Sequence, residues 1–159
     1  MRDADSFNRA PAALQSGGFN KLSRDKPVTD LRASGTATTL RVMVADDNQA
    51  LCQVLAQLID ECPGLSSVAP VFTRDDLVKS VLVQRPDVLV LDLNIGGTSS
   101  LTLLTELRAV SPSTRVVIHS GYQLEALASD AARRGAVAYV AKGGDPDTLI
   151  EAIRRAGQP

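Results

Sequence analysis

Asp87-Val88-Leu89-Val90-Leu91-Asp92 is the stretch of sequence that decides the fold. Four apolar residues in a row stand between two aspartates, without the polar alternation of a strand that has one face in water. An unbroken apolar run of this length is typical of a central parallel strand, because helices cover both faces of such a strand. The stretch therefore predicts a buried parallel strand that ends at Asp92.

Strand and helix patterns alternate on both sides of this run. Apolar residues at positions 51, 54, 55, 58 and 59 have helical spacing, and Thr73 is a predicted N-cap with acids in the turn that follows. Five strand–helix pairs indicate a parallel sheet with helices on both faces and right-handed crossovers. The predicted strands are residues 40–45, 65–72, 87–92, 114–119 and 137–141; the predicted helices are residues 50–59, 74–85, a helix capped by Thr98 or Ser99 that runs through Val110, residues 124–134, and a helix beginning near Pro146.

The first 39 residues differ in composition from the rest. They are rich in Ser, Gly, Asn, Asp and Arg, and their few apolar residues have no sustained period. We expect a disordered N-terminal arm over residues 1–39 and a folded domain over residues 40–157. A short helix near residues 10–15, or a docking segment that orders on a partner, is the alternative for the arm.

Charge and hydropathy exclude several classes of protein. The net charge of -1 argues against general nucleic-acid binding. Residues 1–39 hold six Lys/Arg and four Asp, and residues 40–159 hold eleven Lys/Arg and fourteen Asp/Glu, so the predicted domain is mildly acidic. No apolar run approaches the roughly 20 residues that span a bilayer, and the first 40 residues contain no apolar core of a secretory signal. We therefore expect a cytoplasmic protein that does not bind membranes.

Charged side chains follow three of the predicted strands. Asp46-Asp47 end the first strand, Asp92 ends the third, and Lys142 follows the fifth, while His119-Ser120 end the fourth. Ligands of open parallel sheets bind at the carboxyl ends of the strands, where the strand order reverses. We therefore expect these side chains to meet at one edge of the sheet.

Such a cluster predicts a cation. Two carboxylates on neighbouring strands, about 4.8 Å apart, repel each other by roughly 3–4 kcal/mol at an effective dielectric constant near 20. Oxygen ligands select a hard ion, and a few carboxylates with waters suit Mg²⁺. Lys142 adds a second positive charge and Ser120 a hydroxyl donor, so the site would neutralise phosphoryl oxygens while a carboxylate attacks phosphorus.

The quoted residues carry a resemblance to a known family. Asp46-Asp47, the run from Val88 to Asp92, Ser120-Gly121, and Tyr139 three residues before Lys142 resemble the receiver domain of bacterial two-component response regulators, over about residues 40–156. The resemblance implies an α/β, doubly wound, flavodoxin-like fold: five parallel strands in the order 2-1-3-4-5 with five helices.

The resemblance also implies a function and a set of roles. Asp92 would accept a phosphoryl group from a histidine kinase or a phosphotransfer protein, without turnover catalysis. Lys142 would pair with the phosphoryl group, and Ser120 and Tyr139 would move together as the switch. The signal would pass to a downstream protein partner or a second copy of the chain. The implied Mg²⁺ ligands are Asp46, Asp47, Asp92 and the backbone carbonyl of Asn94.

Three positions depart from the usual receiver pattern. Gly143 stands where proline commonly follows the lysine, Gly96 stands where the loop after the acceptor aspartate usually has proline, and Ser120 replaces the more usual threonine. The two glycines remove rigid elements, so they affect loop geometry and phosphoryl lifetime. The serine keeps the hydroxyl donor.

Other interpretations remain open. The chain could be the receiver part of a transcription factor whose DNA-binding domain lies outside it, or a scaffold that has lost phosphorylation. A phosphatase-type hydrolase with an aspartyl-phosphate intermediate usually has a second aspartate two residues after the nucleophile, where this chain has Asn94. Structural roles are also conceivable: helix caps for Asp46, Asp47 and Ser120, and simple packing for Tyr139 and His119.

Overall fold

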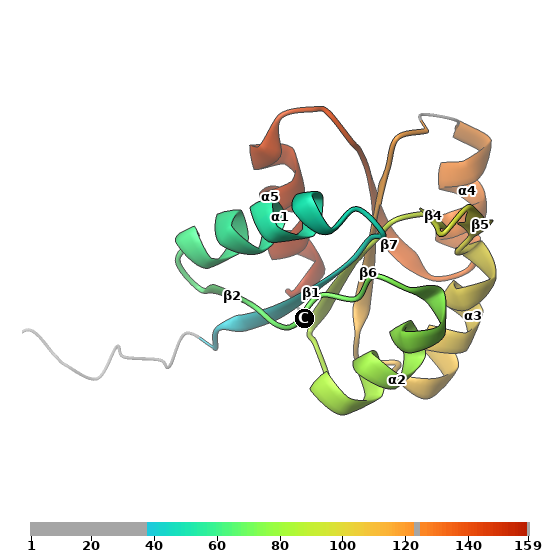
Figure 1. Cartoon of the computed structure of the whole chain (residues 1–159), viewed down its shortest axis with the longest axis horizontal. Helices are drawn as coiled ribbons and strands as arrows, with labels where there is room; N and C mark the ends of the chain where they lie inside the picture. Colours follow the sequence, from blue (N-terminus) through green and yellow to red (C-terminus); the bar gives the residue numbers. More distant parts are fainter. Residues whose placement is uncertain (1–37, 123–124, 159) are drawn as a thin grey trace, which may run out of the picture. The chain divides into compact units, whose positions relative to one another are not determined.

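The central strand is β3 (Val88–Leu91), and all four of its residues are buried. The structure is a computed structural model that describes residues 38–122 and 125–158, so the predicted arm lies outside the described residues except for its last two. β3 belongs to a five-stranded parallel sheet of order β2-β1-β3-β6-β7 (Figure 1). This confirms the predicted order 2-1-3-4-5. The other strands are β1 (Leu40–Ala45), β2 (Leu65–Ser67), β6 (Arg115–Ser120) and β7 (Ala136–Ala141).

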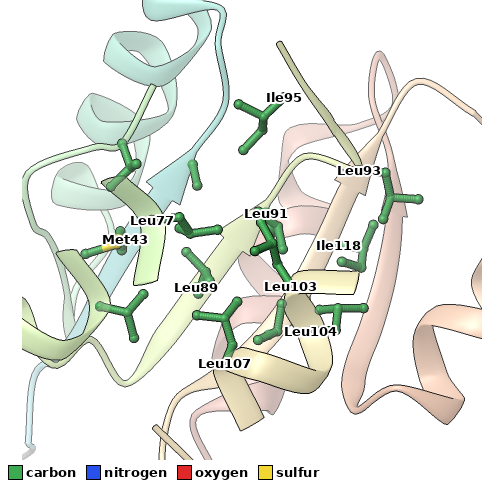
Figure 2. Close-up of a cluster of buried hydrophobic side chains, with 14 of the residues drawn as sticks. Met43, Leu77, Leu89, Leu91, Leu93, Ile95, Leu103, Leu104, Leu107 and Ile118 are labelled. Atoms are coloured by element: carbon green, nitrogen blue, oxygen red, sulfur yellow. The ribbon is translucent and has the colours of Figure 1, made fainter. Parts of the chain in front are cut away.

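Five helices cover the two faces of the sheet, as predicted. α1 (Gln49–Glu61) and α5 (Pro146–Ala156) pack on one face, and α2 (Arg74–Gln84), α3 (Leu101–Val110) and α4 (Glu125–Arg133) pack on the other. Figure 2 shows the core on the second face, where Leu89 and Leu91 of β3 meet leucines of α2 and α3. Each Val or Leu side chain that is fully buried contributes roughly 1.5–3 kcal/mol. The double-sided burial of β3 therefore accounts for its unbroken apolar sequence.

The helix ends follow local chemistry. The Thr73 side chain accepts a hydrogen bond from the backbone N–H of Asp76, so the predicted N-cap of α2 is confirmed. Asn48 caps α1, and Asp145 caps α5 immediately before Pro146. Proline is tolerated at that position because the first N–H of a helix has no intrahelical partner. In the described residues, no helix is long and apolar enough to cross a membrane.

The second strand is shorter than predicted. Residues 65–72 were expected to form one strand, but β2 ends at Ser67, and beyond it only Val71 pairs with Ala45. Pro70 has no N–H to donate to the ladder, which explains the interruption. The backbone returns to β1 at Val71, whose N–H donates to the carbonyl of Val44 and whose carbonyl accepts from the N–H of Asp46.

The segment after β3 forms an additional hairpin. Thr98 or Ser99 was expected to cap the third helix, but these two residues form β5 (Thr98–Ser99), which pairs antiparallel with β4 (Asn94–Ile95). The cap residue of α3 is Ser100, without a side-chain capping bond. Gly96 and Gly97 have φ angles of +63° and +76°. Two consecutive positive φ angles suit a two-residue hairpin turn, so the Gly-Gly pair makes the expected turn, and this turn closes a two-stranded hairpin that was not predicted.

Candidate functional site

Two aspartates stand side by side at the carboxyl edge of the sheet. Ala45 and Leu91 are register partners in β1 and β3, and an aspartate follows each of them. The N–H of Asp92 donates to the carbonyl of Ala45 at 2.9 Å, which continues the ladder to the last position. Asp46 is 2% exposed and Asp92 is 7% exposed. The parallel register therefore places two largely buried carboxylates next to each other.

Asp47 completes a cluster of three carboxylates. One carboxylate oxygen from each of Asp46, Asp47 and Asp92 lies within 4.8 Å of the other two. Two unit charges at that distance repel by roughly 3–4 kcal/mol at an effective dielectric constant near 20. Asp47 is exposed, so solvent weakens its share of the repulsion. The donor set consists of oxygen atoms on three carboxylates, which fits a hard divalent ion such as Mg²⁺.

Lys142 is the positive charge of the cluster. Its Nζ lies 2.6 Å from Oδ2 of Asp46 and 3.1 Å from Oδ2 of Asp92. The lysine follows β7, and its backbone N–H donates to the carbonyl of Ser120, which fixes the start of its loop. Burial lowers the pKa of Lys142, but the hydrogen bonds to the two aspartates outweigh burial and hold the pKa above 10.5. The ammonium group therefore stays charged at neutral pH.

Some carboxylate oxygens of the cluster accept hydrogen bonds from the protein, and others have no partner. Oδ1 of Asp46 accepts the N–H of Asn48, and Oδ2 of Asp47 accepts the N–H of Gly96, both at 2.9 Å. Among the described residues, Oδ1 of Asp47 and Oδ1 of Asp92 have no hydrogen-bond or ion-pair partner. The fold therefore leaves these two oxygens open to bind a cation or to act as a nucleophile.

Asn94 lies on the first strand of the hairpin, two residues after Asp92. The N–H of Ser100 donates to the carbonyl of Leu93, and Asn94 is the register partner of Ser99. Antiparallel ladders alternate bonded and non-bonded pairs. Asn94 therefore occupies a non-bonded pair, and its carbonyl is directed away from β5, where it is available to a ligand.

Ser120 and Tyr139 are close to the cluster along the chain but make their bonds elsewhere. The Ser120 side chain is fully buried, and its hydroxyl accepts the N–H of Tyr122 at 3.3 Å. No hydrogen bond joins Ser120 to Asp92 in the part of the chain that the structure describes. Tyr139 is half-buried, and its hydroxyl donates to the carbonyl of Tyr122. Both side chains therefore hold the same residue, Tyr122.

Two further side chains lie beside the acidic cluster. His119, 7% exposed, is packed in the interior, and no described residue bonds its Nδ1. Burial and the charge of Lys142 hold the pKa of His119 below 6.5. The Cys52 thiol donates to the carbonyl of Asp46 at 3.4 Å, and burial together with the Asp46 charge raises its pKa to about 11. Cys52 is therefore a protonated packing residue.

Comparison with known proteins identifies the family. The family model described as the response regulator receiver domain matches residues 42–154. The chain belongs to this family. As a receiver domain of the response regulator type, it has the fold and the family membership that the residues around Asp46, Asp92 and Lys142 predicted.

Relatives agree with this assignment. A nitrate/nitrite response regulator protein homolog of Haemophilus influenzae is 32% identical over 119 residues, which are 75% of this chain and 57% of the relative. The nitrate/nitrite response regulator NarL of Escherichia coli is 30% identical over 72% of this chain and 53% of its own length. The chain thus spans about half the length of the curated relatives that it matches.

Solved structures resemble the fold closely. A two-component response regulator of the LuxR family from Aurantimonas sp. is 29% identical, with a TM-score of 0.70 and coverage of 74% of this chain and 84% of that one. A response regulator from Burkholderia pseudomallei, solved with a phosphorylated aspartic acid, a calcium ion and citrate, is 25% identical over 72% of this chain and 66% of that one, with a TM-score of 0.66.

The four charged residues at the strand ends converge as the sequence predicted, but one contact of the cluster was not predicted. Asp46, Asp47, Asp92 and Lys142 converge as expected from the strand ends. The bond from the N–H of Gly96 to Asp47 was not expected. Its one signal in the sequence was the glycine pair, which indicated a turn but not the residue toward which the turn donates.

Proposed function

We propose that Asp92 accepts a phosphoryl group from a histidine kinase or a phosphotransfer protein, and that this chemistry makes the domain a signalling switch. The observation that carries the proposal is the pair of contacts from Lys142 to Asp46 and Asp92 inside a cluster of three carboxylates. A buried carboxylate with one open oxygen beside a fixed ammonium group is suited to nucleophilic attack on phosphorus.

The proposed transfer is balanced as follows. Oδ1 of Asp92 forms a new bond to phosphorus while the bond from phosphorus to the donor's imidazole nitrogen breaks, and the imidazole keeps that electron pair and takes up a proton. Lys142 lies within 3.1 Å of Asp92, so it can contact the oxygens of the incoming phosphoryl group. No oxidant or second substrate is required.

Asp46, Asp47, Asp92 and the carbonyl of Asn94 would hold Mg²⁺. The open Oδ1 atoms of Asp47 and Asp92 and the outward carbonyl of Asn94 support this donor set. When bound, the ion would supply positive charge to the phosphoryl oxygens. We expect weak binding, in the millimolar range or somewhat tighter, which corresponds to roughly 4–5 kcal/mol.

Two features argue for a switch and against a hydrolase. Asn94 stands two residues after Asp92, where an aspartate would be needed to exchange a proton with water. Ser120 and Tyr139 both bond Tyr122 in this structure. If phosphorylated Asp92 draws the Ser120 hydroxyl toward it, the contact with Tyr122 breaks, and the surface around Tyr139 changes for a protein partner or a second copy of the chain.

An intact-mass measurement tests the proposal. The protein is incubated with acetyl phosphate, with and without MgCl₂, and we expect the added mass of one phosphoryl group only with Mg²⁺. Asp92→Asn should remain unmodified, and Asp75→Asn, which changes an exposed aspartate at the start of α2, should be modified like wild type. Modification of Asp92→Asn to the wild-type extent would contradict the assignment of the acceptor.

A further inference from the structure

The β4–β5 hairpin is a packed element next to the acidic cluster. It begins two residues after Asp92, and it is closed by Gly96 and Gly97 at positive φ angles. Ile95, only 2% exposed, inserts into the core formed by β3, α2 and α3 (Figure 2). The hairpin is therefore held in place by the core and not only by its own ladder.

Two polar contacts connect the hairpin to distant parts of the chain. At its turn, the N–H of Gly96 donates to Oδ2 of Asp47 at 2.9 Å, across 49 residues of sequence. At its end, the guanidinium of Arg74 donates to the carbonyl of Ser99 at 2.6 Å and to Oγ1 of Thr102 at 2.7 Å. The first contact reaches the acidic cluster, and the second comes from the N-terminus of α2.

The geometry points to a positioning role for this hairpin: Gly96 orients the Asp47 carboxylate for the cation, and Arg74 holds the hairpin so that Gly96 can do so. This inference rests on the metal site of the proposed function. Asp47 is exposed, and within the described residues the N–H of Gly96 is the one hydrogen-bond donor to its carboxylate. Because Oδ2 accepts this bond, Oδ1 is the oxygen of Asp47 that stays open to a cation.

The hairpin also sets the spacing of two ligands at once. Asn94, whose carbonyl is directed outward, and Gly96, which donates to Asp47, lie on the same hairpin. Partners that orient metal ligands in this way typically change metal affinity by about 10- to 100-fold when they are lost. Arg74 acts less directly, because it positions Ser99 and not a metal ligand. Its loss should lower the Mg²⁺ affinity by about 2- to 10-fold, which is the effect of a single hydrogen bond.

Arg74 provides the sharper test, because charge and positioning predict opposite results. Removing a positive charge should by itself strengthen Mg²⁺ binding. Lys79→Ala removes an exposed lysine from the same helix and measures that charge effect alone. In an NMR titration of the full chain with MgCl₂, we expect Arg74→Ala to bind about 2- to 10-fold more weakly than wild type, and Lys79→Ala to bind equally or more tightly.

A second pair of variants tests Gly96 directly. Gly96→Pro has no N–H to donate and cannot adopt the φ of +63°, so it removes both the bond to Asp47 and the turn, and it should bind Mg²⁺ about 10-fold more weakly. Gly96→Asn keeps the N–H, and asparagine tolerates positive φ, so its affinity should stay close to that of wild type. A metal-free readout accompanies them: the Gly96 amide proton should exchange slowly in wild type and faster in Asp47→Ala.

The outcomes separate the two proposals. If wild type binds Mg²⁺ and Arg74→Ala binds as tightly as Lys79→Ala, the positioning role is wrong and the metal site stands. Equal exchange of the Gly96 amide in wild type and Asp47→Ala also overturns the role. If wild type shows no response to Mg²⁺, the metal site itself is wrong, and the hairpin's role in it is overturned as a consequence.

Discussion

Replacing Lys142 with methionine would remove one positive charge from between two buried carboxylates while keeping a side chain of similar length. The side chains of Asp46 and Asp92 are 3% and 8% exposed, and the lysine nitrogen lies 2.6 Å and 3.1 Å from them. The variant therefore tests whether this ion pair stabilises the fold or only shapes the pocket. We expect the free energy of unfolding to fall.

The magnitude is bounded from two directions. At an effective dielectric constant near 20, the two contacts correspond to attractions of roughly 6 and 5 kcal/mol, but burying the ammonium group costs several kcal/mol of that gain. Removing one partner of a buried ion pair typically costs about 3–5 kcal/mol. The lysine side chain is 25% exposed, so we expect a somewhat smaller loss of stability, about 2–4 kcal/mol.

Urea unfolding at pH 7 without Mg²⁺ measures this loss. Lys79→Met is the matched control, because Lys79 is exposed on α2 and its replacement changes the net charge equally. We expect a lower midpoint for Lys142→Met at an unchanged slope, which indicates a change in stability rather than in the unfolded state. Equal midpoints for the two variants would show that the buried ion pair contributes nothing.

Adding Mg²⁺ should reduce the loss of stability that Lys142→Met causes. Three aspartates and one lysine give the cluster a formal charge of -2, and Lys142→Met makes it -3. The variant should therefore bind Mg²⁺ more tightly than wild type. Since a ligand that binds only the folded state stabilises it according to its affinity, the difference in unfolding free energy should shrink as Mg²⁺ is added. A difference independent of Mg²⁺ would place the cation away from Lys142.

Two further predictions concern pH and the switch. Burial and Lys142 hold the pKa of the single histidine, His119, below 6.5. The unfolded chain therefore binds more protons than the folded protein below about pH 6.5, and the free energy of unfolding should fall toward pH 5 by at most about 1.4 kcal/mol per pH unit. Urea midpoints of His119→Val should change less over this pH range, and an equal change in both proteins would exclude His119 as the cause. Ser120→Ala should still be phosphorylated but show smaller NMR shifts at Tyr139 than wild type, whereas equal shifts would show that the hydroxyl only bonds Tyr122.

The sheet was predictable because its signals are local and redundant. Each strand that is buried on both faces needs an unbroken apolar run, as in β3, and each parallel crossover needs a helix pattern between two such runs. Strand ends in a parallel sheet share one edge, so Asp46, Asp92 and Lys142 could be brought together without knowing any distance. The largest boundary error lies in β2, where Pro70 interrupts the ladder.

The hairpin was not predictable by the same reasoning. Gly96-Gly97 indicates a turn, but the pairing of two-residue strands depends on Ile95 entering the core and on Arg74 reaching Ser99 from another helix. These contacts are long-range and leave no periodic pattern. The glycine that departs from the usual receiver sequence makes a contact that proline could not make, because proline at position 96 has no N–H to donate to Asp47.

The local charge explains why both a lysine and a cation would be needed in the proposed phosphorylated state. A phosphoryl group carries about -1.5 to -2 at neutral pH, and on Asp92 it would replace a carboxylate charge of -1. With Asp46, Asp47 and Lys142 present, the cluster would then reach about -2.5 to -3. A divalent ion brings it to between about -0.5 and -1, close to neutrality. Lys142, which is shared with Asp46 in the unmodified protein, becomes free to follow the phosphoryl oxygens only when another positive charge compensates Asp46. Phosphorylation, cation binding and the movement of Lys142 should therefore be coupled.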